Sequence, residues 1–163
     1  MGEDFTFNNV RLVVQAIADF LGQKFPGREI AMIVNYDTRF LSERYAAEAA
    51  KVLSLNRIRV LLAERDSPSQ AQAFQIIKRG VQGGINFTAS FNPPQYNGLK
   101  YNTERGAPAL PAETDVIEAE IRRLQKTYEF VARYARTEGI ERIDLRQDYL
   151  DFLQTKADFG LIR

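Results

Sequence analysis

The chain has 163 residues, 45% hydrophobic and 26% charged, and its 22 basic and 21 acidic residues leave a formal net charge of +1. This is the composition of one globular domain, or of one domain with a piece of another. The balanced charge argues against a nucleic-acid or membrane surface. No apolar run approaches the length of a membrane span, about 20 residues. The chain lacks cysteine and histidine, which excludes disulfides, thiol catalysis and histidine-based triads and fits a cytoplasmic protein.

Helical periodicity and continuous apolar runs alternate along the first half of the chain. In order, the pattern predicts a helix from Thr6 or Asn8 to about Leu21, a strand at 30–34, a helix at 42–55, a strand at 57–63, a helix at 70–79 and a strand at 84–88. Strands and helices that alternate at this spacing specify right-handed crossovers and a largely parallel sheet. The expected fold class is therefore α/β, a three-layer α/β/α arrangement with a mostly parallel, mixed sheet.

Ligands of open parallel sheets gather beyond the carboxyl ends of the strands. Three predicted loops emerge there, at 35–39, 64–69 and 89–96, and they bring together Asp37, Arg39, Arg65, Asp66, Ser67 and Ser90. These side chains are candidates for binding or catalysis. The alternative for Asp37 and Arg39 is structural, because the two could merely pair with each other or cap the following helix.

The loop after the third strand is stiffened on both sides of its centre. Pro93 and Pro94 each fix φ and remove a backbone donor, and Asn97-Gly98 favours a tight turn into a further short strand. Such a loop holds Ser90 in place rather than leaving it mobile. A plain polar connection between strands is the alternative reading of the same residues.

Two motifs resemble those of the α-D-phosphohexomutases, the phosphoglucomutase and phosphomannomutase enzymes. The segment 88–100, Thr-Ala-Ser-Phe-Asn-Pro-Pro-Gln-Tyr-Asn-Gly-Leu-Lys, resembles their phosphoserine loop, and 36–39 resembles their Tyr-Asp-x-Arg motif. The resemblance implies domain I of that family, with Ser90 and Lys100 as catalytic residues and Ser90 binding Mg²⁺ through its phosphate. It further implies substrate binding or loop support for Asp37, Arg39, Asn92 and Asn97.

The chain also departs from the family pattern. Phe91 occupies the position of a histidine in most members, and the metal-binding Asp-Gly-Asp-x-Asp-Arg motif is absent. The resemblance covers about one of four family domains. It predicts domain I at 1–140, without its first strand, and a linker with the start of a truncated second domain at 141–163.

Further helices are expected at 111–125, 128–136 and 147–156. In the last of these, Tyr149, Phe152 and Leu153 form a short apolar stripe, which Phe159 extends. An apolar stripe without cover favours a partner, so the tail is expected to fold back on its own domain, to self-associate with another copy, or to fray.

Two functions follow from the resemblance. The first is the phosphoserine domain of a phosphohexomutase, which acts on glucose or mannose phosphates with Mg²⁺ and with the remaining mutase domains as partners. In this reading the isolated chain is inactive. The second is a non-catalytic α/β module that retains the fold for interaction or regulation; Phe91 and the missing motifs favour it for the isolated chain.

Overall fold

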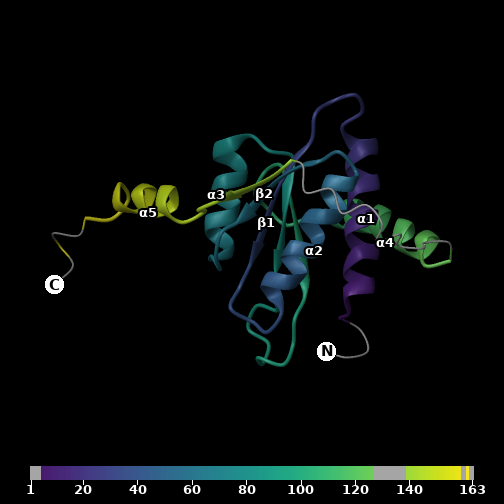
Figure 1. The fold of residues 1–163 in the computed structure, drawn as a ribbon. Helices are drawn as coiled ribbons and strands as arrows, with labels where there is room; N and C mark the ends of the chain where they lie inside the picture. The colour runs from purple at the N-terminus through teal and green to yellow at the C-terminus, as the bar shows by residue number, and fades with distance from the viewer. Residues whose placement is uncertain (1–4, 127–138, 159–160, 162–163) are drawn as a thin grey trace.

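A mixed five-stranded sheet forms the centre of the molecule, and helices cover both of its faces (Figure 1). The computed structural model describes residues 5–126, 139–158 and 161. The strands are β1 (Ala31–Tyr36), β2 (Arg59–Ala63), β3 (Gly83–Phe87), β4 (Leu99–Thr103) and β5 (Ile140–Ile143), in the order β4-β3-β1-β2-β5. Only β4 is antiparallel to its neighbour. The predicted α/β fold with a mostly parallel, mixed sheet is confirmed.

Five helices accompany the described strands: α1 (Phe7–Lys24), α2 (Ser42–Leu55), α3 (Ser69–Arg79), α4 (Pro111–Leu124) and α5 (Gln147–Gln154). Thr6 caps α1, since its hydroxyl accepts a hydrogen bond from the backbone N–H of Asn9 at 3.2 Å. Helix α2 packs on the sheet, and α1 packs against both α2 and α4, whereas α3 covers the opposite face (Figure 1). The helix predicted at 128–136 lies outside the described residues.

The central strands are apolar on both faces because helices cover both. Met32, Ile33 and Val34 of β1 are fully buried, as the continuous apolar run predicts. On the α3 side, Gln72 donates from Nε2 to the carbonyl oxygens of Ile33 and Ile85 at 3.2 and 2.8 Å. Gly84 makes room for this amide, since a Cβ at Gly84 would lie 2.7 Å from Nε2.

Strand β5 crosses the boundary predicted between residues 140 and 141. It pairs with β2 in parallel, with Val60 opposite Ile140 and Ala63 opposite Ile143, and so forms one edge of the sheet. Helix α5 follows it and extends away from the sheet (Figure 1). The boundary itself stays a prediction, and so does self-association through the tail.

Helix α5 contains no buried residue, although its apolar stripe contacts α3. The ring of Phe152 lies 4.9 Å from that of Phe74, and the ring of Tyr149 lies 5.9 Å from it. Phe159 lies outside the described residues. None of the described helices is long and apolar enough to span a membrane.

Candidate functional site

The side chain of Arg39 holds the serine loop, residues 88–98, by its backbone. Its guanidinium donates to the carbonyl oxygens of Ser90 (2.8 Å), Asn92 (2.7 Å), Pro93 (2.8 Å) and Tyr96 (3.1 Å). Its Nε donates to Asp37 Oδ2 at 3.1 Å. The five N–H groups of a guanidinium are thereby all used, which fixes the loop by a planar fork that no other side chain offers.

Asp37 connects this fork to α2. Its Oδ1 accepts hydrogen bonds from the backbone N–H of Arg39 and from Ser42 Oγ, both at 3.0 Å. Asn97 Nδ2 donates to the same Ser42 hydroxyl at 2.9 Å, and Asn97 Oδ1 accepts from the N–H of Gly98 at 2.8 Å. Asp37, Arg39 and Asn97 therefore form one network that closes the loop at both ends.

One structural alternative for Asp37 is realised, since it pairs with Arg39. The other is not, because Asp37 bonds the Ser42 hydroxyl and no side chain caps α2. Arg39 does more than pair with Asp37, because four of the five hydrogen bonds of its guanidinium go to the serine loop.

Ser90 stands exposed at the tip of this network. Its φ is +57°, an uncommon left-handed conformation for a residue other than glycine. The backbone N–H of Ser90 donates to Thr88 Oγ1 at 3.0 Å, and its carbonyl accepts from Arg39. The Ser90 hydroxyl makes no hydrogen bond within the described part of the chain, so the backbone is fixed while the hydroxyl is exposed.

Lys100 lies on β4 opposite Asn86 of β3, so the two side chains share the α3 face of the sheet. It is exposed and makes no ion pair among the described residues. Beside it, Ser69, Asn86 and Asn102 line a hollow of about 220 Å³ between α3 and β4. Asn86 Nδ2 donates to Ser69 Oγ at 2.7 Å. Lys100 therefore presents an ammonium group to this hollow.

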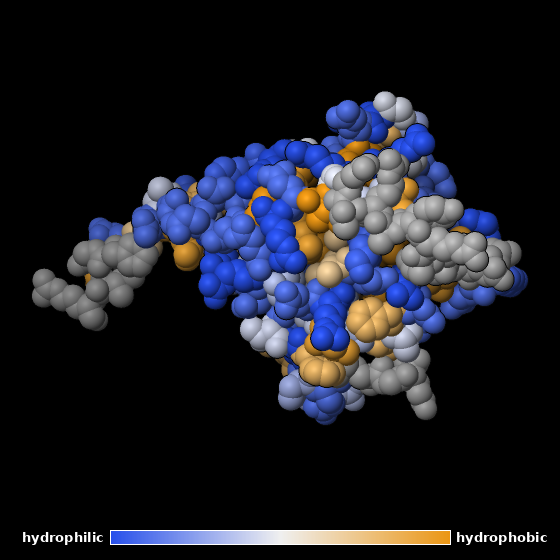
Figure 2. Space-filling view, viewed as in Figure 1, coloured by the Kyte–Doolittle hydropathy of each residue, from blue (hydrophilic) through white to orange (hydrophobic). Residues whose placement is uncertain are grey.

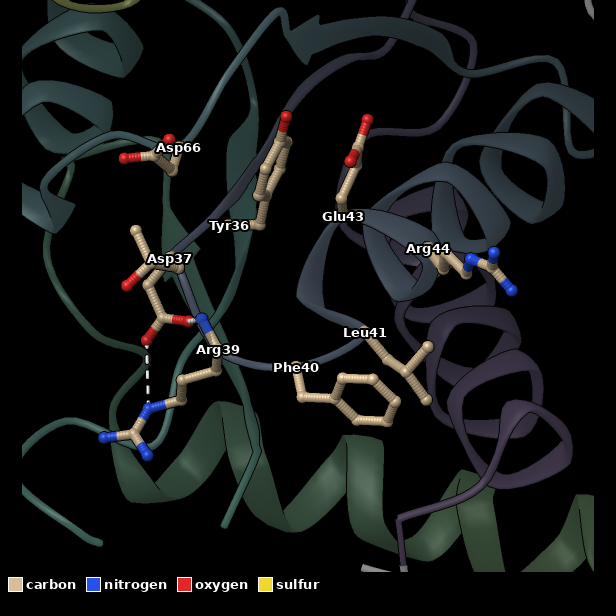
Figure 3. A pocket seen from close by; sticks show the side chains of 9 residues that line it. Tyr36, Asp37, Arg39, Phe40, Leu41, Glu43, Arg44 and Asp66 are labelled. Atoms are coloured by element: carbon tan, nitrogen blue, oxygen red, sulfur yellow. Dashed lines mark hydrogen bonds and ion pairs between the residues drawn. The ribbon is translucent and has the colours of Figure 1, made fainter. Parts of the chain in front are cut away.

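A larger cavity of about 530 Å³ opens on the other side of Arg39 (Figure 3). Tyr36, Glu43 and Asp66 surround it together with Asp37 and Arg39, so loops after β1 and β2 meet there as predicted for the carboxyl edge. Burial, reinforced by the negative charge of Glu43, raises the pKa of the Tyr36 phenol. Phe40 forms part of its wall and is 70% exposed.

Metal ligands are sparse in the part of the chain that the structure describes. It contains no group of three or more aspartate, glutamate, histidine or cysteine side chains that could hold a metal ion.

Comparison with known proteins decides the family. A profile of the phosphoglucomutase/phosphomannomutase alpha/beta/alpha domain I matches residues 1–128. The chain belongs to the phosphoglucomutase/phosphomannomutase family. The matching domain is domain I, as the two motifs predicted.

Relatives of this mutase domain are considerably longer. A phosphoglucomutase of Staphylococcus saprophyticus is 32% identical over 106 residues, which are 65% of this chain and 19% of the relative. A phosphoglucomutase of Komagataeibacter xylinus is 28% identical over 98% of this chain and 31% of its own length. The chain therefore spans about a third or less of these curated relatives.

Solved structures show the same fold. A Thermus thermophilus protein classed provisionally as a phosphomannomutase superposes with a TM-score of 0.82 at 28% identity, over 98% of this chain and 34% of that one. The phosphoglucomutase parafusin of Paramecium, in its open form, superposes with a TM-score of 0.75 at 25% identity, over 94% and 32%.

Sequence reasoning did not find two members of this candidate site. Ser42 was expected only to open a helix, yet its buried hydroxyl joins Asp37 to Asn97. Thr88 was read as the end of a strand, yet its hydroxyl fixes the N–H of Ser90. Thr88 lies within the family-like segment 88–100, which was the available signal for it, whereas Ser42 lies beyond the 36–39 motif and carried no such signal. Asn92 supports the loop through its backbone, while its side chain is exposed.

Proposed function

We propose that Ser90 carries a transferable phosphate and that the chain is the phosphoserine domain of an enzyme that interconverts hexose phosphates. The observation that carries this proposal is the exposed Ser90 hydroxyl on a backbone that Arg39 and Thr88 hold from both sides. A group that must meet a phosphoryl donor and acceptor in line gains from such fixed positioning. Family membership and the phosphoglucomutase relatives support the substrate class.

The proposed reaction has two balanced steps. Phosphoserine 90 gives its phosphoryl group to a free hydroxyl of a hexose monophosphate, so that the serine Oγ–P bond breaks and a new sugar O–P bond forms. The proton of the sugar hydroxyl moves to the serine oxygen. The resulting bisphosphate then returns its other phosphoryl group to Ser90, with the reverse proton transfer, and the isomeric monophosphate leaves.

Lys100 has a distinct proposed role in these steps. Its ammonium group has no competing carboxylate among the described residues, so it can stabilise the negative charge on the equatorial phosphoryl oxygens. Mg²⁺, when bound to the phosphoserine, would add further neutralisation of that charge. The carboxylate ligands and the clamp for the second phosphate would come from other mutase domains.

The decisive experiment joins this chain to those domains. Residues 1–163 replace the matching segment of the S. saprophyticus phosphoglucomutase, and the chimera is incubated with glucose 1,6-bisphosphate and Mg²⁺. Peptide mass spectra are expected to place the phosphate on Ser90, and Ser90→Ala is expected to abolish both the phosphate and glucose 1-phosphate turnover. The isolated 163-residue chain is expected to show no turnover.

Two results would contradict the proposal. Phosphate on Ser67 or Ser69 instead of Ser90 would mean that a different loop carries the group. A folded chimera that never becomes phosphorylated, with far-UV circular dichroism equal to that of the parent enzyme, would favour the non-catalytic module.

A further inference from the structure

Phe91 is the most exposed large apolar side chain in the described part of the chain. Its side chain is 102% exposed, against 70% for Phe40 and 54% for Tyr96, the other exposed aromatic residues nearby. Figure 2 shows apolar surface at the foot of the molecule, over the loops that follow β1 and β3 in Figure 1. A single exposed apolar side chain is common on protein surfaces, so it is the position of Phe91 beside Ser90 that makes it a candidate for ligand contact.

The backbone around Phe91 is pinned on both sides. The carbonyl oxygens of its two neighbours, Ser90 and Asn92, both accept hydrogen bonds from Nη2 of Arg39, at 2.8 and 2.7 Å. The N–H of Asn92 also donates to the carbonyl of Ala89 at 3.1 Å. The segment is therefore closed on its Arg39 side, and the ring of Phe91 is presented outward from a fixed base.

Phe91 also lies next to the reactive hydroxyl. Consecutive Cα atoms are about 3.8 Å apart, so a molecule that exchanges a phosphoryl group with Ser90 comes close to the backbone of Phe91. In an extended strand, successive side chains would point to opposite faces. The φ of +57° at Ser90 ends that alternation, so the serine and the ring are not forced onto opposite sides.

The chemistry of the ring selects one kind of occupant. A phenyl group neither donates nor accepts an ordinary hydrogen bond and transfers no proton, so it offers only an apolar surface with an electron-rich face. A pyranose ring has a matching side, where its C–H groups form an apolar face that is bordered by hydroxyl groups. A free phosphate or a linear polyol phosphate has no such face.

We propose that Phe91 is the sugar-stacking residue of this domain, and that it positions a hexose phosphate by contact with the C–H face of the pyranose while Ser90 exchanges the phosphoryl group. The proposal rests on the proposed function of Ser90 and adds to it the part of the substrate that this chain contacts. Phe91 is a positioning and specificity residue, since the stack distinguishes sugars by the arrangement of their axial groups.

The test uses the 163-residue chain and saturation-transfer NMR. Aromatic protons are irradiated, and transfer to the ring C–H protons of glucose 1-phosphate is compared with transfer to glycerol 3-phosphate, which carries phosphate and hydroxyls but no ring. Glucose 1-phosphate is expected to receive the stronger transfer. Phe91→Ala is expected to raise its Kd by about 2- to 10-fold, the usual range for loss of one aromatic contact, and Phe91→Tyr to retain it.

Controls separate a stack from a general effect. Removal of a fully exposed ring leaves no cavity, so Phe91→Ala is expected to unfold at the same urea concentration as the wild type. Ile77→Ala deletes another exposed apolar side chain, 64% exposed on the C-terminal half of α3, and is expected to leave the sugar signal unchanged.

Three outcomes are informative. Unchanged sugar contact in Phe91→Ala, or no transfer to glucose 1-phosphate in the wild type, overturns the stacking proposal. If Ser90 in the chimera still becomes phosphorylated, the function of the serine stands without the stack. If the sugar contact depends on Phe91 but Ser90 never accepts phosphate, the stacking proposal stands. The proposal that Ser90 carries a phosphate is then contradicted.

Discussion

Nη2 of Arg39 donates a hydrogen bond to the backbone carbonyl of Ser90 at 2.8 Å, across 51 positions in the sequence. The proposed reactive residue is thus positioned by a side chain of another loop that binds its backbone and leaves its hydroxyl free. A side chain with all five N–H groups engaged in the protein has none left for a substrate. In this structure Arg39 organises the serine loop, and substrate binding by Arg39 stays a prediction.

Replacement of Arg39 by lysine should release the serine loop. A lysine ammonium is a single point of charge and cannot span carbonyl groups along a planar fork. We expect the opening free energy of residues 90–96 to fall by about 1–3 kcal/mol, as for loss of hydrogen bonds to a charged donor. Amide exchange should become faster in these residues and stay unchanged in β1. Arg44→Lys, in the same cavity wall, is the matched control; equal exchange in both variants would contradict the role of Arg39.

Ser42→Ala should destabilise the whole domain. The Ser42 hydroxyl is fully buried and joins Asp37 Oδ1 to Asn97 Nδ2, so its loss removes one hydrogen bond from each. Asp37 Oδ1 keeps only the N–H of Arg39, and Asn97 Nδ2 keeps only the carbonyl of Phe40. The expected loss in free energy of unfolding is about 1–3 kcal/mol, measured by urea titration. Thr38→Ala, at an exposed neighbouring position, should change it by less than about 0.5 kcal/mol.

Two glycine-to-alanine substitutions should have opposite effects. A Cβ at Gly84 would lie 2.7 Å from Gln72 Nε2 and 3.0 Å from the carbonyl oxygen of Ile33, so Gly84→Ala should cost about 1–3 kcal/mol by overpacking. At Gly22, inside α1, nothing lies within 4 Å of the added Cβ. Gly22→Ala should stabilise by about 0.5–1 kcal/mol through helix propensity. The unfolding temperatures of both variants measure the contrast. A higher unfolding temperature for Gly84→Ala would show that the Gln72 side chain can move away from the added Cβ.

The bridge from Lys24 to two carboxylates should make stability depend on pH. Lys24 Nζ lies 2.7 Å from both Glu104 and Glu113 and joins α1 to the turn after β4 and to α4. The hydrogen bond from Lys24 lowers the pKa of Glu113; burial opposes the charge of Lys24, but its two hydrogen bonds outweigh this and raise its pKa.

A carboxyl group whose pKa is lowered on folding stabilises the fold above its ordinary value of 4.5 and loses this contribution as the pH falls through the lowered pKa. Lys24→Met should therefore cost about 1 kcal/mol at pH 7, after allowance for solvent screening, and little at pH 2. Urea titrations at both pH values measure the difference, with the exposed Lys126→Met as control. If Lys24→Met lowers the free energy of unfolding equally at both pH values, the loss comes from the contacts of Lys24 with the rings of Phe20 and Phe25.

The local sequence determines most of the sheet and its helices. The apolar run at 30–34 specifies a strand buried on both faces, and Ser42–Leu55 begins and ends as a helix where the pattern predicted. Strand β5 escapes such reasoning, because two of its four residues, Glu141 and Arg142, are charged and exposed. Its pairing with β2 rather than its composition makes it a strand.

The sequence predicted several members of the candidate site but not the hydrogen bonds that join them. Motifs brought Asp37, Arg39, Asn97 and Ser90 together. The acceptors of Arg39 are backbone carbonyl groups, which every residue possesses, so no sequence pattern marks them. The same holds for Ser42, whose position at a helix start suggests capping, whereas its hydroxyl lies between two side chains of other segments.

Lys100 also bears on solubility. Strand β4 is the outer strand beyond β3, and the backbone of 107–109 covers only its later part, through bonds of Thr103 to Ala107 and of Ala109 to Tyr101. Lys100 lies at the uncovered beginning, where a charge opposes the pairing of one sheet edge with another molecule. A variant that removes this charge could lose activity by aggregation alone, so sedimentation must accompany any kinetic measurement on Lys100 variants.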